Sequence, residues 1–113
     1  MKKFMITYHT PSSIYESMQN ENSEKKQERK QSWMKWYQEN EKNLVDYGAP
    51  VVNSRNLSNK GDRDSKIELS GYFIIQAENL DKAISLLSNH PHITTEDSCT
   101  LEINEIMPMP NMK

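Results

Sequence analysis

The sequence predicts a single α+β domain over residues 1–113, with the ferredoxin-like order β-α-β-β-α-β. Three observations lead to this prediction. A chain of 113 residues suits one domain with one modest core. Short β-rich runs occur near both ends and around residue 74, and two stretches between them have the period of a helix. Right-handed crossovers then place both helices on one face of a four-stranded antiparallel sheet.

The first predicted strand covers residues 4–8, where apolar and mixed residues alternate until Thr10-Pro11. The connection after it shows no apolar periodicity, and we expect at most a short helical turn around Tyr15. Two segments, 16–31 and 53–70, are strongly polar, so we expect both to be mobile.

A helix is predicted from residue 28 to residue 46. Its stripe recurs at steps of three and four and consists of Trp33, Trp36, Tyr37, Asn40 and Leu44. Gly48 lies just past the stripe and Pro50 follows, which is typical of a helix end. Val51-Val52 then suggest a short second strand, and residues 53–70 a long hairpin arm or loop.

The second half of the chain gives clearer patterns. Residues 71–77 form the best strand, and Asn79 is placed as the N-cap of a helix whose apolar stripe runs to residue 87. Pro91 lies beyond the end of that helix. The last strand is predicted at residues 100–106, with alternating apolar and polar side chains.

The strand at residues 71–77 also predicts a partner. Tyr72 and Ile74 point to one face of the sheet, whereas Phe73, Ile75 and Ala77 point to the other. Two helices cover only one of these faces, and a large bare apolar patch is rare on a monomer. We therefore expect a homodimer packed sheet to sheet, with a fold-back of a polar loop as the alternative.

Composition excludes several classes of function. Lys and Arg number 14 against 16 Asp and Glu, which argues against a nucleic-acid partner. The single cysteine, Cys99, forms no intrachain disulfide and no CxxC motif. No apolar run approaches the roughly 20 residues of a membrane span or resembles a signal peptide. We expect a cytoplasmic protein without a membrane partner.

The candidates for chemistry are few. His90 and Asp46 are the weak catalytic candidates: His90 also reads as a cap of the preceding helix, and Asp46 as a residue that hydrogen-bonds in a turn. His92 completes a His-x-His pair, but a third ligand is lacking, so no metal and no cofactor are expected. We expect His9 at the opposite end of the sheet from this pair. Candidate ligand-binding side chains are Trp33, Trp36, Tyr72 and His92, with a core role as the alternative for the two tryptophans.

The order and spacing of several strings resemble the YCII-related family, including its DGPF-like branch. These strings are Trp33-x-x-Trp36-Tyr37, residues 44–50, residues 71–77, Leu80-Asp81-x-Ala83, His90-Pro91-His92 and Leu101-Glu102-Ile103. The resemblance implies a ferredoxin-like fold and a dimeric α-β barrel, but no defined activity. Many members carry a His on the first helix and an Asp before the Pro that follows the second helix, proposed as an acid–base dyad. This chain has no His near Ser32, has His90 in place of the Asp and lacks the DGPF string, so the resemblance does not carry the dyad over.

Three functions remain open from the sequence. The first is a dimeric small-molecule-binding or sensing module. The second is an enzyme, such as a lyase, isomerase or hydrolase of a small metabolite, with His90 as general acid or base and Asp46 or Tyr72 beside it. The third is an accessory dimer that binds another protein through the charged segment 16–31.

Overall fold

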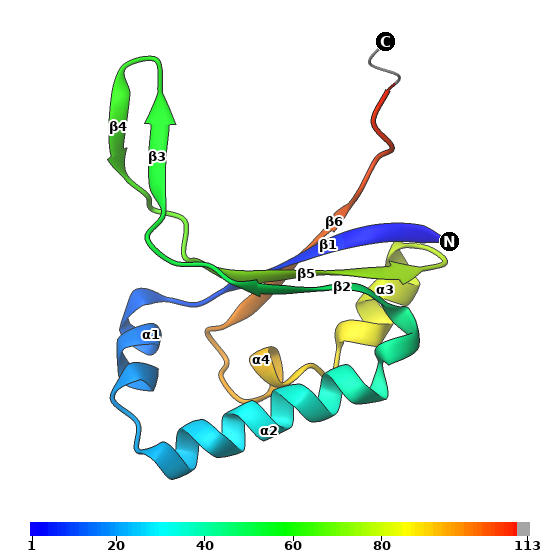
Figure 1. Cartoon of the computed structure of the whole chain (residues 1–113), viewed down its shortest axis with the longest axis horizontal. Helices are drawn as coiled ribbons and strands as arrows, with labels where there is room; N and C mark the ends of the chain where they lie inside the picture. The colour runs from blue at the N-terminus through cyan, green and yellow to red at the C-terminus, as the bar shows by residue number, and fades with distance from the viewer. Residues whose placement is uncertain (111–113) are drawn as a thin grey trace.

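A computed structural model describes residues 1–110 of the chain. The elements, in chain order, are β1 (Lys2–His9), α1 (Ser12–Gln19), α2 (Ser23–Glu39), the 3-10 turn η1 (Glu41–Asn43), β2 (Leu44–Pro50), β3 (Arg55–Ser58), β4 (Gly61–Asp64), β5 (Leu69–Ala77), α3 (Leu80–Leu87), α4 (Pro91–Thr94) and β6 (Thr100–Glu105). Figure 1 shows the four helices together on one side of the main sheet.

The main sheet has four strands in the order β2-β5-β1-β6, and each neighbouring pair is antiparallel. Ile6 in the centre of β1 lies opposite Phe73 of β5 and Ile103 of β6. The first crossover carries α1 and α2, and the second carries α3 and α4. This is the predicted α+β, ferredoxin-like arrangement, with the second and fourth strands of the motif at the edges.

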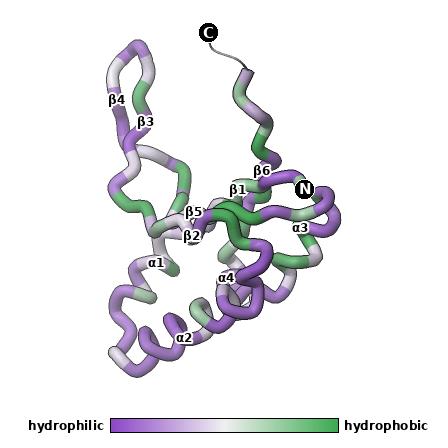
Figure 2. Tube along the Cα trace, turned by 45° about the vertical axis from the view of Figure 1, so that its right-hand side comes forward, coloured by the Kyte–Doolittle hydropathy of each residue, from purple (hydrophilic) through white to green (hydrophobic). Residues whose placement is uncertain are grey.

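The core lies between the sheet and the helices. Alternate residues of β1 and β5 point into it, because side chains of a strand alternate between its two faces. Phe4, Ile6, Phe73 and Ile75 have no exposed surface. Leu87 of α3 closes the core from the helix side. Figure 2 shows the hydrophobic stretches gathered in the sheet, whereas most of α2 is hydrophilic.

The end of α2 and the position of the second strand differ from the prediction. The helix ends at Glu39, because Asn40 turns back and its side-chain amide donates to the carbonyl oxygen of Trp36 at 2.8 Å. The second strand is Leu44–Pro50 rather than Val51-Val52, and it pairs with β5 through two register shifts. The predicted end of the helix is therefore divided: residues 41–43 form the turn η1 and residues 44–46 begin the edge strand β2.

The two polar segments form regular structure. Residues 16–31 belong mostly to α1 and α2, and Asn22 caps α2 by accepting a hydrogen bond from the backbone N–H of Lys25 at 2.8 Å. Residues 53–70 contain the predicted hairpin arm, in which β3 and β4 pair with each other. Figure 1 shows this arm rising from the sheet on the side away from the helices.

The second face of the sheet carries no helix (Figure 1). Met5 of β1 lies opposite Ile74 of β5, and Thr7 lies opposite Tyr72. We call the outward side chains of Met5, Thr7, Tyr72 and Ile74 and their neighbours the open face. Met5 is 38% exposed, while Tyr72 and Ile74 are half-buried. Within residues 1–110, none of the helices has the length and apolar character needed to cross a bilayer.

Candidate functional site

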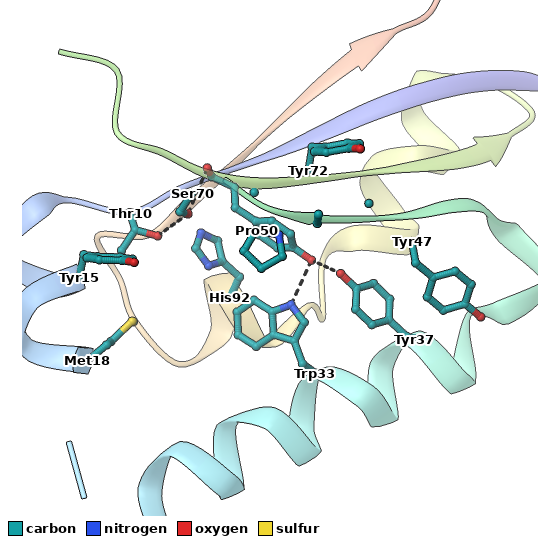
Figure 3. A pocket seen from close by; sticks show the side chains of 14 residues that line it. Thr10, Tyr15, Met18, Trp33, Tyr37, Tyr47, Pro50, Ser70, Tyr72 and His92 are labelled. Carbon is teal, nitrogen blue, oxygen red and sulfur yellow. Dashed lines mark hydrogen bonds between the residues drawn. The ribbon is translucent and has the colours of Figure 1, made fainter. Parts of the chain in front are cut away.

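A pocket of about 350 Å³ lies beneath the sheet, between the strands and the helices α1, α2 and α4. Its lining is mainly aromatic and apolar and consists of Tyr8, Thr10, Tyr15, Met18, Trp33, Tyr37, Tyr47, Gly48, Ala49, Pro50, Ser70, Gly71, Tyr72 and His92. Figure 3 shows the rings of Trp33 and Tyr37 rising from α2, and Tyr15 and Met18 facing them from α1. The volume falls near the lower limit of ordinary ligand pockets, roughly 300–1,000 Å³.

Local sequence explains how these groups reach the pocket. Tyr8 is the last core-facing residue of β1, so its long side chain reaches down from the strand end toward α2. Trp33 and Tyr37 are four residues apart on α2, which places both rings on one side of the helix. Pro91 begins α4, and this short helix carries His92 beneath the end of β1.

The hydroxyl of Tyr8 is the centre of a hydrogen-bond network. It lies 2.7 Å from the hydroxyl of Tyr37, 2.9 Å from Nε2 of His90 and 3.1 Å from Nε1 of Trp33. Burial raises the pKa of Tyr8, and the neighbouring Tyr37 raises it further. Burial also raises the pKa of Tyr37, although hydrogen bonding by Tyr8 and Trp33 acts in the opposite direction and lowers it in part. Both phenols are therefore protonated at neutral pH.

His90 lies behind this network, in the core. Its ring has no exposed surface and is stacked on Phe73, with the ring centroids 5.7 Å apart. Nδ1 accepts a hydrogen bond from the backbone N–H of His92 at 3.0 Å, so His90 caps the start of α4 rather than the end of α3. Burial, with a smaller contribution from the neighbouring His92, lowers the pKa of His90 to about 3. The ring is neutral.

This geometry bears on the hypothesis of His90 as a general acid or base. Both of its ring nitrogens have protein partners, and it is not among the residues that line the pocket. A molecule in the pocket would reach His90 only through Tyr8. Direct proton transfer between His90 and such a molecule is therefore disfavoured.

His92 does line the pocket, and it lies closer to β1 than predicted. Its Nε2 donates to the carbonyl oxygen of His9 at 3.1 Å, so the α3–β6 connection passes beneath the end of β1 and not near its start. Burial lowers the pKa of His92, although hydrogen bonding to the backbone of His9 and Thr100 acts in the opposite direction and raises it in part. The side chain of His9 itself turns to the open face, where Nε2 lies 2.9 Å from Oγ1 of Thr7.

The predicted ligand-binding residues divide into two groups. Trp33 and His92 line the pocket. Trp36 is a core residue, 4% exposed, whose indole N–H donates to Oδ1 of Asn89 at 3.0 Å. Tyr72 borders the pocket, but Figure 3 shows its ring on the opposite side of β5 from Trp33 and His92.

Asp46 lies outside the pocket. It is exposed, in the edge strand β2, and its Oδ1 accepts a hydrogen bond from the backbone N–H of Gly48 at 2.8 Å. This is the turn-bonding role that the sequence offered as an alternative to a pocket role. The same bond holds the chain in the register shift before Ala49.

The side chains that line the pocket but were not predicted from the sequence as ligand-binding include Tyr8, Thr10, Tyr15, Met18, Tyr37 and Tyr47. One signal was present for Tyr8: a buried tyrosine at a strand end needs a hydrogen-bond partner for its hydroxyl. Nothing in the sequence indicated that the partners come from α2 and from the residue before Pro91. Within residues 1–110, no three His, Cys, Asp or Glu side chains converge as metal ligands, and every buried polar side-chain atom has a partner.

Comparisons with known proteins bear on the chain arrangement alone. The sequence matches no protein-family model and no curated protein. One solved structure similar to this chain is 5-chloro-2-hydroxyhydroquinone dehydrochlorinase (TftG) from Burkholderia phenoliruptrix AC1100, in complex with 2,5-dihydroxybenzoquinone. The match covers 88% of this chain and 90% of that one, with 16% identity and a TM-score of 0.48. At this identity and TM-score, the similarity concerns only the overall course of the polypeptide chain. The fold is assigned from the sheet order and the helix placement described above.

Proposed function

We propose that this chain is a small-molecule-binding or sensing module of YCII-like type, which takes a flat, mainly apolar molecule into the pocket beneath its sheet. The observation that carries the proposal is the lining: the rings of Tyr8, Trp33 and Tyr37 form a wall on one side of an open space of about 350 Å³. A ligand with one or two fused rings would replace water against these rings, which stabilises a complex by the hydrophobic effect.

The binding proposal does not require a catalytic group. Asp46 lies outside the pocket and both ring nitrogens of His90 are occupied, which argues against a His90–Asp46 acid–base pair. The charged segment 16–31 is largely helical and contributes Met18 to the pocket. Its position favours a role in enclosing the ligand over a role in recruiting another protein.

We also propose that two copies of the chain pair through their open faces. The support is the mixed character of that face: apolar side chains of Met5, Tyr72 and Ile74 run across its centre, beside the polar Thr7 and Gln76. An isologous contact between two such faces would remove this stripe from water in both copies. The hairpin of β3 and β4 rises on the same side (Figure 1) and would flank the second copy.

The binding proposal is tested with indane, a flat hydrocarbon of two fused rings. The chain contains 2 tryptophans, and their indole N–H groups give separate signals in a ¹H–¹⁵N NMR titration. Trp33 lines the pocket, whereas Trp36 bonds to Asn89 in the core. We expect the Trp33 signal to shift with a saturating dependence on indane concentration, and the Trp36 signal to change much less.

A variant pair completes this test. Trp33→Leu removes a ring from the pocket wall and should weaken indane binding by about fivefold, the effect of one lost aromatic contact. Met34→Leu changes a neighbouring side chain that is 50% exposed and does not line the pocket, and it should leave binding unchanged. Equal shifts of both indole signals, or equal losses in both variants, would contradict binding in this pocket.

A further inference from the structure

The direction of each hydrogen bond around Tyr8 follows from its partners. Nδ1 of His90 accepts from the backbone N–H of His92 at 3.0 Å, so Nδ1 carries no hydrogen. A neutral imidazole has one N–H, which must then be at Nε2. Nε2 lies 2.9 Å from the hydroxyl oxygen of Tyr8, so His90 donates to Tyr8.

Tyr8 receives a second hydrogen bond from Trp33. The indole N–H has no acceptor capacity, and it donates to the Tyr8 oxygen at 3.1 Å. Two of the three neighbours of this oxygen are therefore donors. The third neighbour, the hydroxyl of Tyr37 at 2.7 Å, is the one group that can accept the hydrogen of Tyr8.

The hydroxyl of Tyr37 is fixed as a donor by this arrangement. Its oxygen accepts from Tyr8, and its own hydrogen has no protein acceptor among residues 1–110. Tyr37 lines the pocket, and its hydroxyl lies 2.7 Å from that of Tyr8. A group that approaches Tyr37 from the pocket therefore meets a hydroxyl hydrogen.

We infer that the pocket selects ligands that present a hydrogen-bond acceptor, such as a carbonyl oxygen, to the hydroxyl of Tyr37. This inference rests on the proposed binding function and names the ligand class. His90 and Tyr8 act as positioning residues, because they set the direction of the Tyr37 hydroxyl without touching the ligand. A ligand that offers only an N–H at this point leaves the hydroxyl hydrogen of Tyr37 without an acceptor, which costs affinity.

The first test needs no ligand. Long-range ¹H–¹⁵N NMR correlations of the imidazole rings distinguish the two tautomers and the charged form at neutral pH. We expect His90 with its proton on Nε2 and an unprotonated Nδ1. A proton on Nδ1 would allow Tyr8 to donate to Nε2 of His90. The hydrogen bonds from His90 through Tyr8 to Tyr37 would then run in the opposite direction, so that result overturns the inference.

The second test uses three probes that share one fused-ring skeleton. 1-Indanone carries a carbonyl acceptor, indole carries an N–H donor and indane carries neither. We expect Tyr37→Phe to weaken 1-indanone by about fivefold, the effect of one neutral hydrogen bond, and to leave indane unchanged. Indole should bind the wild type less tightly than 1-indanone, and Tyr37→Phe should remove this difference.

Met34→Leu is the control for Tyr37→Phe. Met34 lies on the same helix, is 50% exposed and does not line the pocket. This variant should leave the affinities of all three probes unchanged. If indole loses affinity in Tyr37→Phe and 1-indanone does not, Tyr37 is an acceptor and the inference is wrong. If none of the probes binds the wild type, the proposed function itself fails, and the assignment of ligand class fails with it.

Discussion

The local environment of His90 strongly alters the ordinary protonation of a histidine. A histidine beside a helix end is commonly charged at mildly acidic pH, and the sequence placed His90 at such an end. In the structure it is surrounded by the rings of Trp36, Phe73 and Tyr8, and its two nitrogens serve a backbone N–H and a phenol. Charging it would leave a buried cation with a donor, the N–H of His92, pointing at its Nδ1.

The stability of the fold should therefore fall as the pH falls. The pKa of His90 is about 3 in the folded chain and 6.5 as an ordinary histidine, so between these values the unfolded chain binds a proton that the folded chain does not. Stability is fully present above pH 6.5 and is lost as the pH drops through this window. From pH 7 to pH 5, His90 alone should cost about 2 kcal/mol of unfolding free energy, measured by urea denaturation.

His90→Asn provides the reference for that measurement. An asparagine keeps an acceptor for the N–H of His92 but has no titrating group. This variant should be less stable at pH 7, because Tyr8 loses a donor and the ring leaves a cavity. Its loss between pH 7 and pH 5 should be smaller than that of the wild type by about 2 kcal/mol. The same loss in both proteins would show that His90 does not control the pH dependence.

At the scale of elements, β2 shows why local pattern is insufficient. The stripe that predicts a helix includes Leu44, but this side chain packs on the core from a strand that pairs with Ile75. The stripe also includes Asn40, whereas this residue ends the helix through its own side chain. A leucine four residues after an asparagine fits both structures. Residues 44–50 form a strand because the edge of β5, far along the chain, offers hydrogen-bond partners to their backbone.

Gly48 makes the close approach of β2 to β5 possible. Its φ is +68°, and a Cβ at this position would overlap the carbonyl oxygen of Tyr72. Gly48→Ala therefore forces the two strands apart and strains the backbone, and we expect a loss of at least about 2 kcal/mol in unfolding free energy. Pocket binding of indane should weaken in the same variant, because Gly48 belongs to the lining.

The comparison for this prediction is Gly61→Ala in the hairpin. Gly61 also has a positive φ, +108°, but no atom lies within 4 Å of the position that an alanine methyl group would take there. Gly61→Ala therefore places an alanine at an unfavourable positive φ but causes no steric overlap. The hairpin is also a separate two-stranded sheet, outside the main sheet. We expect a much smaller loss of stability in urea denaturation. Equal losses for the two variants would mean that the contact with Tyr72 is not what requires glycine at position 48.

At the scale of the whole molecule, the fold was predictable and the site was largely not. Alternation in β1 and β5 and the cap at Asn79 are local signals, and each gave its element correctly. The pocket, by contrast, brings together Tyr8, Tyr37 and His92, which come from three elements separated by long stretches of chain. Trp33 was a candidate because large aromatic residues are conspicuous in the sequence. The roles of Tyr8 and Tyr37 depend on distances that pattern alone does not give.

The proposed pairing of copies is tested by mass in solution. Light scattering at micromolar concentration should give twice the 13.2 kDa mass of the chain. Ile74→Lys places a charge in the centre of the open face and should produce a monomer with an unchanged fold, judged by circular dichroism. Ile84→Lys alters an isoleucine of α3 that is 46% exposed on the helix side, and it should leave the pair intact. A wild-type monomer, or a monomer from both variants, would contradict pairing through the open face.

The strands β1 and β5 are the whole thickness of protein between the pocket and the open face. Neighbouring residues of one strand serve opposite surfaces: Tyr8 faces the pocket while Thr7 faces outward, and Tyr72 turns its ring outward beside the pocket-lining Gly71. Enlarging the pocket by displacing β5 would thus also change the relief of the outer surface. A side-chain substitution can change one of the two surfaces alone, whereas a shift of the backbone changes both. Adaptation of the pocket to a bulkier ligand by a backbone shift would therefore also require changes in the outer contacts.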